Sequence, residues 1–132
     1  MAARLCAGGL PTTVHDLAPD AVAALVAAGA ARAGSARAVG AAADVIGVCV
    51  RDDADVMAVV LGPDGLLAGA RPGTVIAIHS TILPRTVREL AATAGEHGVA
   101  VVDACVTGGP TGADQGRLHE VGVGRVLGRL AG

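Results

Sequence analysis

A polar, glycine-rich segment follows an apolar run near the end of the sequence, between Asp103 and Leu118. Asp103 ends the run Val99–Val102, and the tripeptide Thr107-Gly108-Gly109 follows it closely. A hydroxyl group and consecutive backbone N–H groups without an obstructing Cβ can bind a carboxylate, because the ligand can approach the backbone closely. An ordinary glycine-rich turn has the same composition. The segment is therefore a candidate carboxylate-binding site, with a plain turn as the alternative.

Asp16 is a second candidate, at the end of the run Thr12–Val14 and directly after His15. A carboxylate in this position can accept hydrogen bonds from the 2′ and 3′ hydroxyl groups of an adenosine ribose, and it favours NAD over NADP. The ordinary alternative is that Asp16 caps the helix expected to begin near Pro19. Asp16 alone does not decide between these roles.

Three aspartates, Asp52, Asp53 and Asp55, lie close together in the sequence. No further carboxylate or histidine is spaced to complete a metal coordination shell, so a metal site is not favoured. We expect these side chains to cap a helix and to interact favourably with its N-terminal dipole.

Two other segments contain residues that could take part in catalysis or cofactor binding. Ser80 lies beside His79, but the Gly-x-Ser-x-Gly elbow of a hydrolase is missing, which disfavours acyl transfer. Thr81 could bond a cofactor or cap the helix expected from Pro84, and its chemistry leaves both roles open. The third glycine of Gly122–Gly128 comes one residue late for a dinucleotide-binding loop, and no second strand with an acid follows, so we reject that role.

Composition and charge exclude several classes of protein. The net charge is −2, the pI is about 6.0, and the ten basic residues are arginines scattered along 132 residues. Without a basic stripe, nucleic acid and anionic lipid are not expected partners. No apolar run is long enough to cross a membrane. Three cysteines without ligand spacing predict reduced thiols and a cytoplasmic location.

Short β-branched runs alternate with longer runs rich in alanine and leucine at helical spacing, which predicts an α/β fold around a parallel sheet. The expected strands are Thr12–Val14, Val45–Val50, Thr74–Ile78 and Val99–Val102. The expected helices are Met1–Ala7, Pro19–Ala28, Ser35–Ala43, Ala54–Leu61 and Pro84–His97. Because parallel open sheets bind ligands at the carboxyl ends of their strands, we expect the candidate residues to gather there.

Taken in order, these segments resemble the β-hydroxyacid dehydrogenase family, which includes 3-hydroxyisobutyrate dehydrogenase, tartronate semialdehyde reductase and the 6-phosphogluconate dehydrogenases. The resemblance covers most of residues 1–118 and rests on Val14–Asp16, Ala43–Ile46, Pro63–Leu67, Arg71–Thr74, His79–Pro84 and Asp103–Leu118. It implies a Rossmann-like NAD(P)-binding domain and hydride transfer between nicotinamide and a short 3-hydroxyacid or semialdehyde. By the same resemblance, Thr107, Gly108 and Gly109 would contact the substrate. The cofactor would be contacted by Asp16, the backbone of Val50 and Arg51, Asp55 and Thr81.

The sequence departs from the family pattern at both ends. The family opens with a strand and a Gly-x-Gly-x-x-Gly loop before the helix that here begins at Met1. Its catalytic group is a lysine of a second, all-helical domain, whereas this sequence contains no lysine. Cys105 stands where the family usually has proline. We therefore expect residues 1–118 to form a partial NAD(P)-binding domain and residues 119–132 to form a divergent tail, with the helical domain absent.

A domain without its first strand is expected to be marginally stable. That strand is central in this fold, and its hydrogen bonds and apolar side chains are worth on the order of 10 kcal/mol. Whole domains are stable by only about 5 to 15 kcal/mol. We expect weak stability unless a second copy or a partner chain covers the open edge, and no catalysis by these residues alone. The alternatives are a non-catalytic carboxylate- or nucleotide-binding module that acts with another subunit, or a truncated product without function.

Overall fold

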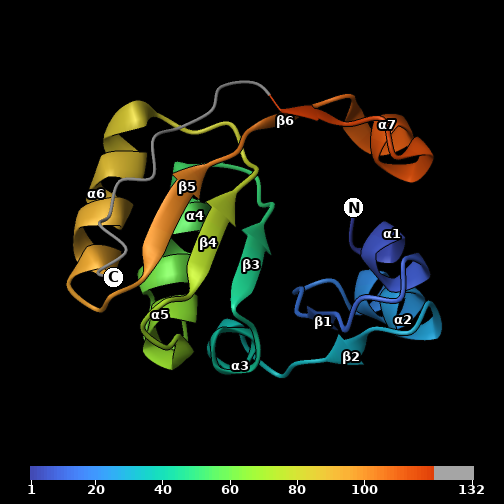
Figure 1. The fold of residues 1–132 in the computed structure, drawn as a ribbon, viewed down its shortest axis with the longest axis horizontal. Helices are drawn as coiled ribbons and strands as arrows, with labels where there is room; N and C mark the ends of the chain where they lie inside the picture. The colour runs from blue at the N-terminus through green and yellow to red at the C-terminus, as the bar shows by residue number, and fades with distance from the viewer. Residues whose placement is uncertain (121–132) are drawn as a thin grey trace.

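The computed structural model describes residues 1–120, which form two α/β units and a C-terminal arm (Figure 1). We call residues 1–34 the small unit, residues 35–104 the large unit and residues 105–120 the arm. The small unit contains α1 (Ala2–Ala7), β1 (Thr13–Val14), α2 (Pro19–Ala27) and β2 (Ala31–Arg32). Its two strands pair in parallel, with Thr13 opposite Ala31.

The large unit holds a three-stranded parallel sheet in the order β3-β4-β5. Its strands are β3 (Val45–Val48), β4 (Val75–Ile78) and β5 (Ala100–Asp103), and Ile46, Ile76 and Val101 share one register line. Its helices are α3 (Ala36–Ala42), α4 (Asp53–Leu61), α5 (Leu66–Gly69) and α6 (Pro84–Gly95). Local capping fixes the helix starts, since Ser35 accepts from the N–H of Ala38 and Asp52 accepts from the N–H of Asp55.

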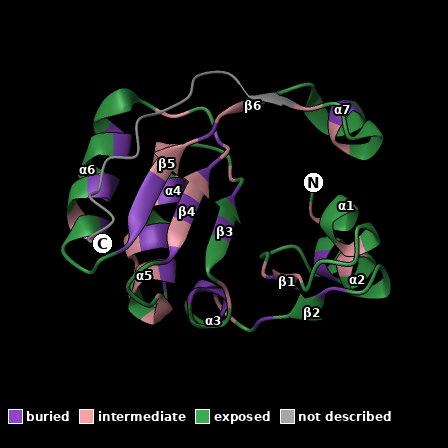
Figure 2. Cartoon of the chain, in the orientation of Figure 1, coloured by how far each residue is buried: buried purple, intermediate pink, exposed green. Residues whose placement is uncertain are grey.

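The main core lies between the sheet and the helices of the large unit. Alternate residues of β3 and β4 are buried, as expected for strands with one covered face. Figure 2 shows that most of the buried residues belong to the sheet and helices of the large unit. Ile76, Ile78, Leu90, Val56 and Val60 are fully buried in this core. Helices α3 and α5 pack closely because Gly40 faces the Leu66 carbonyl and Gly69 faces the Arg37 carbonyl, where a Cβ would clash. The small unit has only a minor cluster, formed by Val14, Val22 and Ala30.

The arm leaves the end of β5 and carries β6 (Val106–Thr107), α7 (Gly109–Gln115) and β7 (His119–Glu120). Strands β6 and β7 pair antiparallel, and Thr107 lies opposite His119. Figure 1 shows the arm running from the large unit toward the small unit, where α7 contacts α1. Gly116 has φ 67°, which favours glycine, and a Cβ there would lie 2.8 Å from Nη2 at the tip of the Arg4 side chain.

The predicted α/β fold with parallel strands and flanking helices is confirmed. All four expected strands and all five expected helices exist, with ends shifted by a few residues. The prediction omitted β2 and β6, whose two-residue lengths are too short for a periodic signal, and the helices α5 and α7. It also expected one sheet, whereas no strand within residues 1–120 bonds the small sheet to the large one.

Two further findings concern the same described part of the chain. None of its helices is long and apolar enough to span a membrane. Its three cysteines, Cys6, Cys49 and Cys105, are unpaired thiols. The rejected glycine motif at Gly122–Gly128 lies outside the described residues.

Candidate functional site

The carboxyl ends of β3 and β4 are joined by one buried hydroxyl group. Ser80 follows β4, and its Oγ donates to the Val50 carbonyl oxygen and accepts from the Val50 N–H, both at 2.8 Å. Ser80 is only 5% exposed, so no solvent competes for these bonds. The backbone of Val50, a predicted cofactor contact, is therefore held in a fixed position beside Thr81. Because Ser80 was considered only as a nucleophile, its role as a backbone clamp was missed, and nothing in the local sequence signals it.

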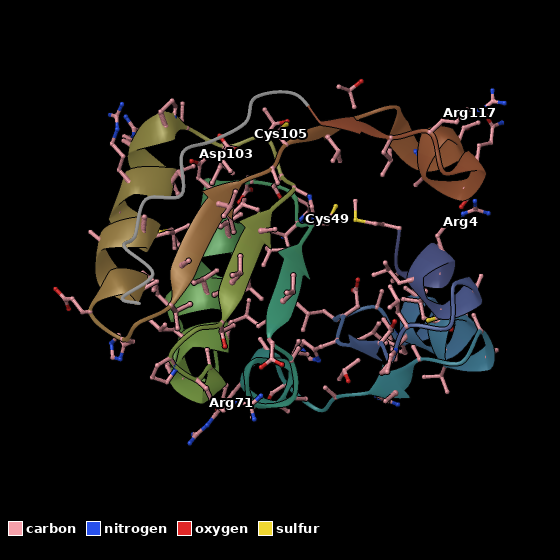
Figure 3. All side chains as sticks on the ribbon, in the orientation of Figure 1. Arg4, Cys49, Arg71, Asp103, Cys105 and Arg117 are labelled. Carbon is pink, nitrogen blue, oxygen red and sulfur yellow. The ribbon has the colours of Figure 1, made fainter. Side chains whose placement is uncertain are left out.

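The carboxyl ends of β4 and β5 are joined in a similar way. Nδ1 of His79 lies 2.9 Å from the Ala104 carbonyl oxygen, and Oγ1 of Thr81 lies 3.2 Å from Sγ of Cys105. Thr81 does not cap α6, because the N-cap residue of that helix is Leu83. Thr81 is exposed, and its partner Cys105 precedes Thr107 by two residues in the chain. This pair links the predicted cofactor segment to the predicted substrate segment. Figure 3 labels Cys105 where the arm leaves β5.

Arg51 and Asp55 form an ion pair at the start of α4. Nε of Arg51 donates to Oδ2 of Asp55 at 2.7 Å, and Nη2 donates to Oδ1 at 3.2 Å. The hydrogen bond from Arg51 lowers the pKa of Asp55, and the same contact raises the pKa of Arg51. Both residues were predicted to lie near the cofactor, and the structure places them beside Val50. The Asp55 carboxylate is already neutralised by a guanidinium group.

Asp53 was predicted to cap its own helix, and the structure corrects this prediction. Asp52 caps α4, whereas Asp53 reaches the start of α6. Its Oδ1 accepts a 2.9 Å hydrogen bond from the N–H of Leu83 and a 2.5 Å hydrogen bond from Oγ1 of Thr86. The bond from Thr86, followed by that from Leu83, lowers the pKa of Asp53. The aspartate cluster thus ties α4 to α6, a pairing between residues 30 or more positions apart that local sequence cannot reveal.

Asp16 lies on the small unit, separate from the cluster around Val50 and Thr81. The N-cap position of α2 is Ala18, and Oδ1 of Asp16 accepts a 2.8 Å hydrogen bond from the Ala18 N–H. This is an Asx turn just before the helix and not the N-cap that the alternative interpretation expected. The side chain is exposed and follows directly on β1.

The Thr107-Gly108-Gly109 segment opens the arm. Thr107 ends β6, and all three residues are exposed. Gly108 has φ 118° and Gly109 has φ 58°, conformations that favour glycine. A Cβ on Gly109 would meet nothing within 4 Å, so its backbone is open to an approaching group. The segment has the accessible backbone that carboxylate recognition needs. No described residues form a group of three or more side chains that could hold a metal ion.

The structure therefore brings some predicted site residues together and leaves others apart. Val50, Arg51, Asp55 and Thr81 gather at the ends of β3 and β4. Thr107 is connected to them through Cys105, whereas Asp16 belongs to the other sheet.

Comparisons with known proteins identify the family of this chain. The family model described as the NAD binding domain of 6-phosphogluconate dehydrogenase matches residues 1–124. NAD-dependent L-serine dehydrogenase of Pseudomonas aeruginosa is 43% identical over 118 residues, which cover 89% of this chain and 40% of that protein. The chain thus spans about two fifths of the length of the curated relatives that it matches.

Solved structures give the same result. A crystal structure of an oxidoreductase from Mycobacterium avium 104 has a TM-score of 0.84 and 42% identity, covering 96% of this chain and 44% of that one. The 3-hydroxyisobutyrate dehydrogenase of Mycobacterium tuberculosis, solved with L-serine, has a TM-score of 0.82 and 34% identity over 90% of this chain and 40% of that one. The chain therefore belongs to the 6-phosphogluconate dehydrogenase NAD-binding domain family, among relatives that resemble 3-hydroxyisobutyrate dehydrogenase.

Proposed function

We propose that the chain is the cofactor-binding part of an NAD-dependent oxidoreductase that acts on a short 3-hydroxyacid or its semialdehyde. The observation that carries this proposal is the set of contacts at the strand ends. Ser80 holds the Val50 backbone, and Thr81 contacts Cys105, two residues before Thr107. A cofactor lying across β3 and β4 would thus have its reactive end beside the Thr107 segment.

The residues proposed for NAD suit its ribose and nicotinamide ends. The exposed Asp16 carboxylate suits ribose hydroxyl groups, and its negative charge favours NAD over NADP. Ser80 fixes the Val50 backbone, whose carbonyl oxygen keeps a second lone pair, the Arg51 backbone follows it directly, and the exposed Thr81 hydroxyl offers a donor. Asp55 contributes by holding the Arg51 side chain. When bound, NAD would supply the hydride acceptor.

Thr107, Gly108 and Gly109 are proposed to bind the substrate carboxylate and hydroxyl group. Their open backbone and positive φ values support this role. Oxidation would move a hydride from the hydroxyl-bearing carbon to nicotinamide and release the hydroxyl proton. The sequence has no lysine to take up that proton. We therefore propose that residues 1–118 form a partial cofactor domain that does not turn over substrate alone, followed by a divergent tail from residue 119.

A second candidate role is a non-catalytic binding module that acts with another subunit, either a second copy or a different chain. The separation of the small sheet from the large one favours this role, because both sheets have strand edges without partners among residues 1–120. Three unpaired thiols support a cytoplasmic location, both for a part of an oxidoreductase and for a non-catalytic binding module.

Titration calorimetry of the full chain with NAD and NADP tests the cofactor proposal. We expect NAD to bind more tightly than NADP, and Asp16→Asn to weaken NAD binding. Asp20→Asn, which removes an exposed carboxylate from α2 of the same unit, is the matched control and should leave NAD affinity unchanged. Absence of NAD binding, or tighter binding of NADP, would contradict the proposal. NADH oxidation by the purified chain with a semialdehyde would contradict the proposed inactivity.

A further inference from the structure

We propose that His79 is a positioning residue that fixes where the proposed substrate segment, residues 107–109, lies relative to Thr81 of the cofactor site. This inference rests on the proposed function, because residues 107–109 matter here as the segment that binds the substrate. It gives a role to a side chain that the proposed cofactor and substrate contacts leave unused. The imidazole ring follows β4 directly and lies between β3 and the point where the chain leaves β5.

The end of β4 holds both backbone groups of Ala104, the residue that precedes the arm. The N–H of Ala104 donates to the Ile78 carbonyl oxygen at 2.9 Å. The carbonyl oxygen of Ala104 can only accept, so Nδ1 of His79, which lies 2.9 Å away, carries a proton and donates it to this bond. Ala104 is buried, and a buried carbonyl group without a partner is costly. The His79 ring therefore fixes the backbone at the point where β5 has ended.

The position of Ala104 decides where the substrate segment starts, because only two residues separate Ala104 from Thr107. The next side-chain contact with the large unit joins Sγ of Cys105 to Oγ1 of Thr81 at 3.2 Å. Thiol groups are weak hydrogen-bonding partners, so the shorter bond from His79 is the stronger of these two attachments. Loss of the His79 bond should therefore let the start of the arm move away from Thr81.

A glycine of β3 makes room for the same imidazole ring. A Cβ on Gly47 would lie 3.1 Å from Nε2 and 3.2 Å from Cδ2 of His79, closer than ordinary van der Waals contact, so it would push the ring. The φ of Gly47 is not positive, so its backbone conformation does not require glycine. Glycine weakens the interior of a strand and often marks the close approach of another group. The ring is thus placed from two sides, by Ala104 and by Gly47.

The rate at which iodoacetamide alkylates Cys105 measures how firmly the start of the arm is held. The full 132-residue chain is labelled and analysed by peptide mass spectrometry, and Cys6 of the small unit, which is also half-buried, is the internal control. We expect His79→Ala to speed labelling of Cys105 by about three- to tenfold, as for the loss of one hydrogen bond, and to leave Cys6 unchanged. His79→Asn should change the rate by less than about twofold, because its amide nitrogen can donate from the position of Nδ1.

Gly47→Ala tests the same ring from the side of β3. The added methyl group should displace the ring and speed labelling of Cys105, although by less than His79→Ala does, because a displaced ring keeps part of its bond. In the His79→Ala background, Gly47→Ala should have no further effect, because no ring is left to displace. Independent structural roles for the two residues would instead give additive effects. Circular dichroism verifies that all variants fold.

Binding of 3-hydroxypropionate, the simplest 3-hydroxyacid, measures the consequence for the site. Titration calorimetry is performed on the full chain in the presence of NAD. We expect His79→Ala to weaken 3-hydroxypropionate binding by about threefold or more, and to weaken it more than NAD binding. His79→Asn should bind 3-hydroxypropionate like the unmodified chain, which a general loss of stability at this position would not explain.

Three results would overturn the proposal. The first is an unchanged labelling rate of Cys105 in His79→Ala. The second is a rise that Cys6 or the His79→Asn variant shares, which would mean general loosening. The third is faster labelling of Cys105 with unchanged affinity for 3-hydroxypropionate. If the unmodified chain binds no 3-hydroxypropionate, the proposed function of residues 107–109 fails, and the labelling rates still decide whether His79 holds the start of the arm.

Discussion

The small unit and the large unit are built from the same kinds of residue but bury them to very different extents. Four-residue strands in the large unit lie against helices and carry a continuous core that includes Ile76, Ile78 and Leu90. Two-residue strands in the small unit support only the cluster around Val14 and Val22. The difference shows that similar sequence composition gives unequal burial when one unit shares no strand with its neighbour. It also puts the proposed ribose contact, Asp16, on the unit with the smaller core.

The largest expected difference comes from truncating one leucine in each unit. Leu90 of α6 is fully buried in the main core, whereas Leu25 of α2 is only partly buried against the minor cluster. We expect Leu90→Ala to lower the free energy of unfolding by about 2 to 5 kcal/mol. Leu25→Ala should cost about 1 kcal/mol or less, because fewer neighbours lose contact. Urea unfolding measures both, and equal losses would contradict the unequal cores.

Removal of the Ser80 hydroxyl is the next effect in size. Ser80→Ala leaves the N–H and C=O groups of the half-buried Val50 without their side-chain partner, which should cost about 1 to 3 kcal/mol. The matched change in the small unit is Thr12→Val, because Thr12 donates only to the Leu10 carbonyl near the surface. Its expected cost is within about 0.5 kcal/mol. If Ser80→Ala proves as mild as Thr12→Val in urea unfolding, the clamp does not hold the strand ends.

The tie between α4 and α6 should appear as a dependence of stability on pH. A carboxyl group whose pKa is lowered by folding binds fewer protons than in the unfolded chain, as for Asp53. Its contribution is therefore present above about pH 4, the pKa of an unfolded aspartate. That contribution is lost as the pH falls through the lowered pKa of the folded state.

Asp53→Asn should thus flatten the fall in stability below about pH 4. Thr86→Val, which removes the larger cause of the pKa shift but keeps the carboxylate, should flatten it partly. Thermal unfolding from pH 2 to pH 6 measures the slopes. Identical slopes for both variants and the unmodified chain would show that Asp53 gains nothing from this contact.

The smallest effect is expected at the surface of the large unit. Arg71 donates to Asp44 at 2.9 Å, but both side chains are mostly exposed. Such pairs contribute about 0 to 1 kcal/mol, so Arg71→Ala should leave the unfolding midpoint nearly unchanged. A large fall in the unfolding midpoint would mean that the start of β3 depends on this ion pair. It would also mean that a surface contact stabilises the chain as much as a core contact does.

Much of the large unit could be predicted from the sequence because its signals are local. β-branched runs marked β3, β4 and β5, and Ser35 and Asp52 marked helix starts. The gathering of Val50, Arg51 and Thr81 followed from the general rule for parallel strand ends. Strands of two residues, such as β2 and β6, are too short to show an alternation of apolar and polar residues, so the sequence did not predict them.

The contacts that organise the site could not be predicted because they join distant residues. Ser80 reaches Val50 across 30 positions, and Asp53 reaches Thr86 across 33. A serine beside a histidine and an aspartate near a helix start both have common local explanations, which the sequence favoured. No sequence pattern predicted that the parallel strands divide into two sheets, although the expected absence of a central strand predicted open strand edges. The roles proposed for Asp16 and Thr107 stay predictions.

Native-state hydrogen exchange tests most directly the claim that the chain consists of two unequal units without a shared strand. The account predicts that amides of α2, including Val22, exchange through local opening at a free energy well below that of global unfolding. Amides of β4, such as Ile76 and Ile78, should exchange only with global unfolding. Equal protection of Val22 and Ile76, with the same dependence on denaturant, would show one cooperative domain and would contradict the account.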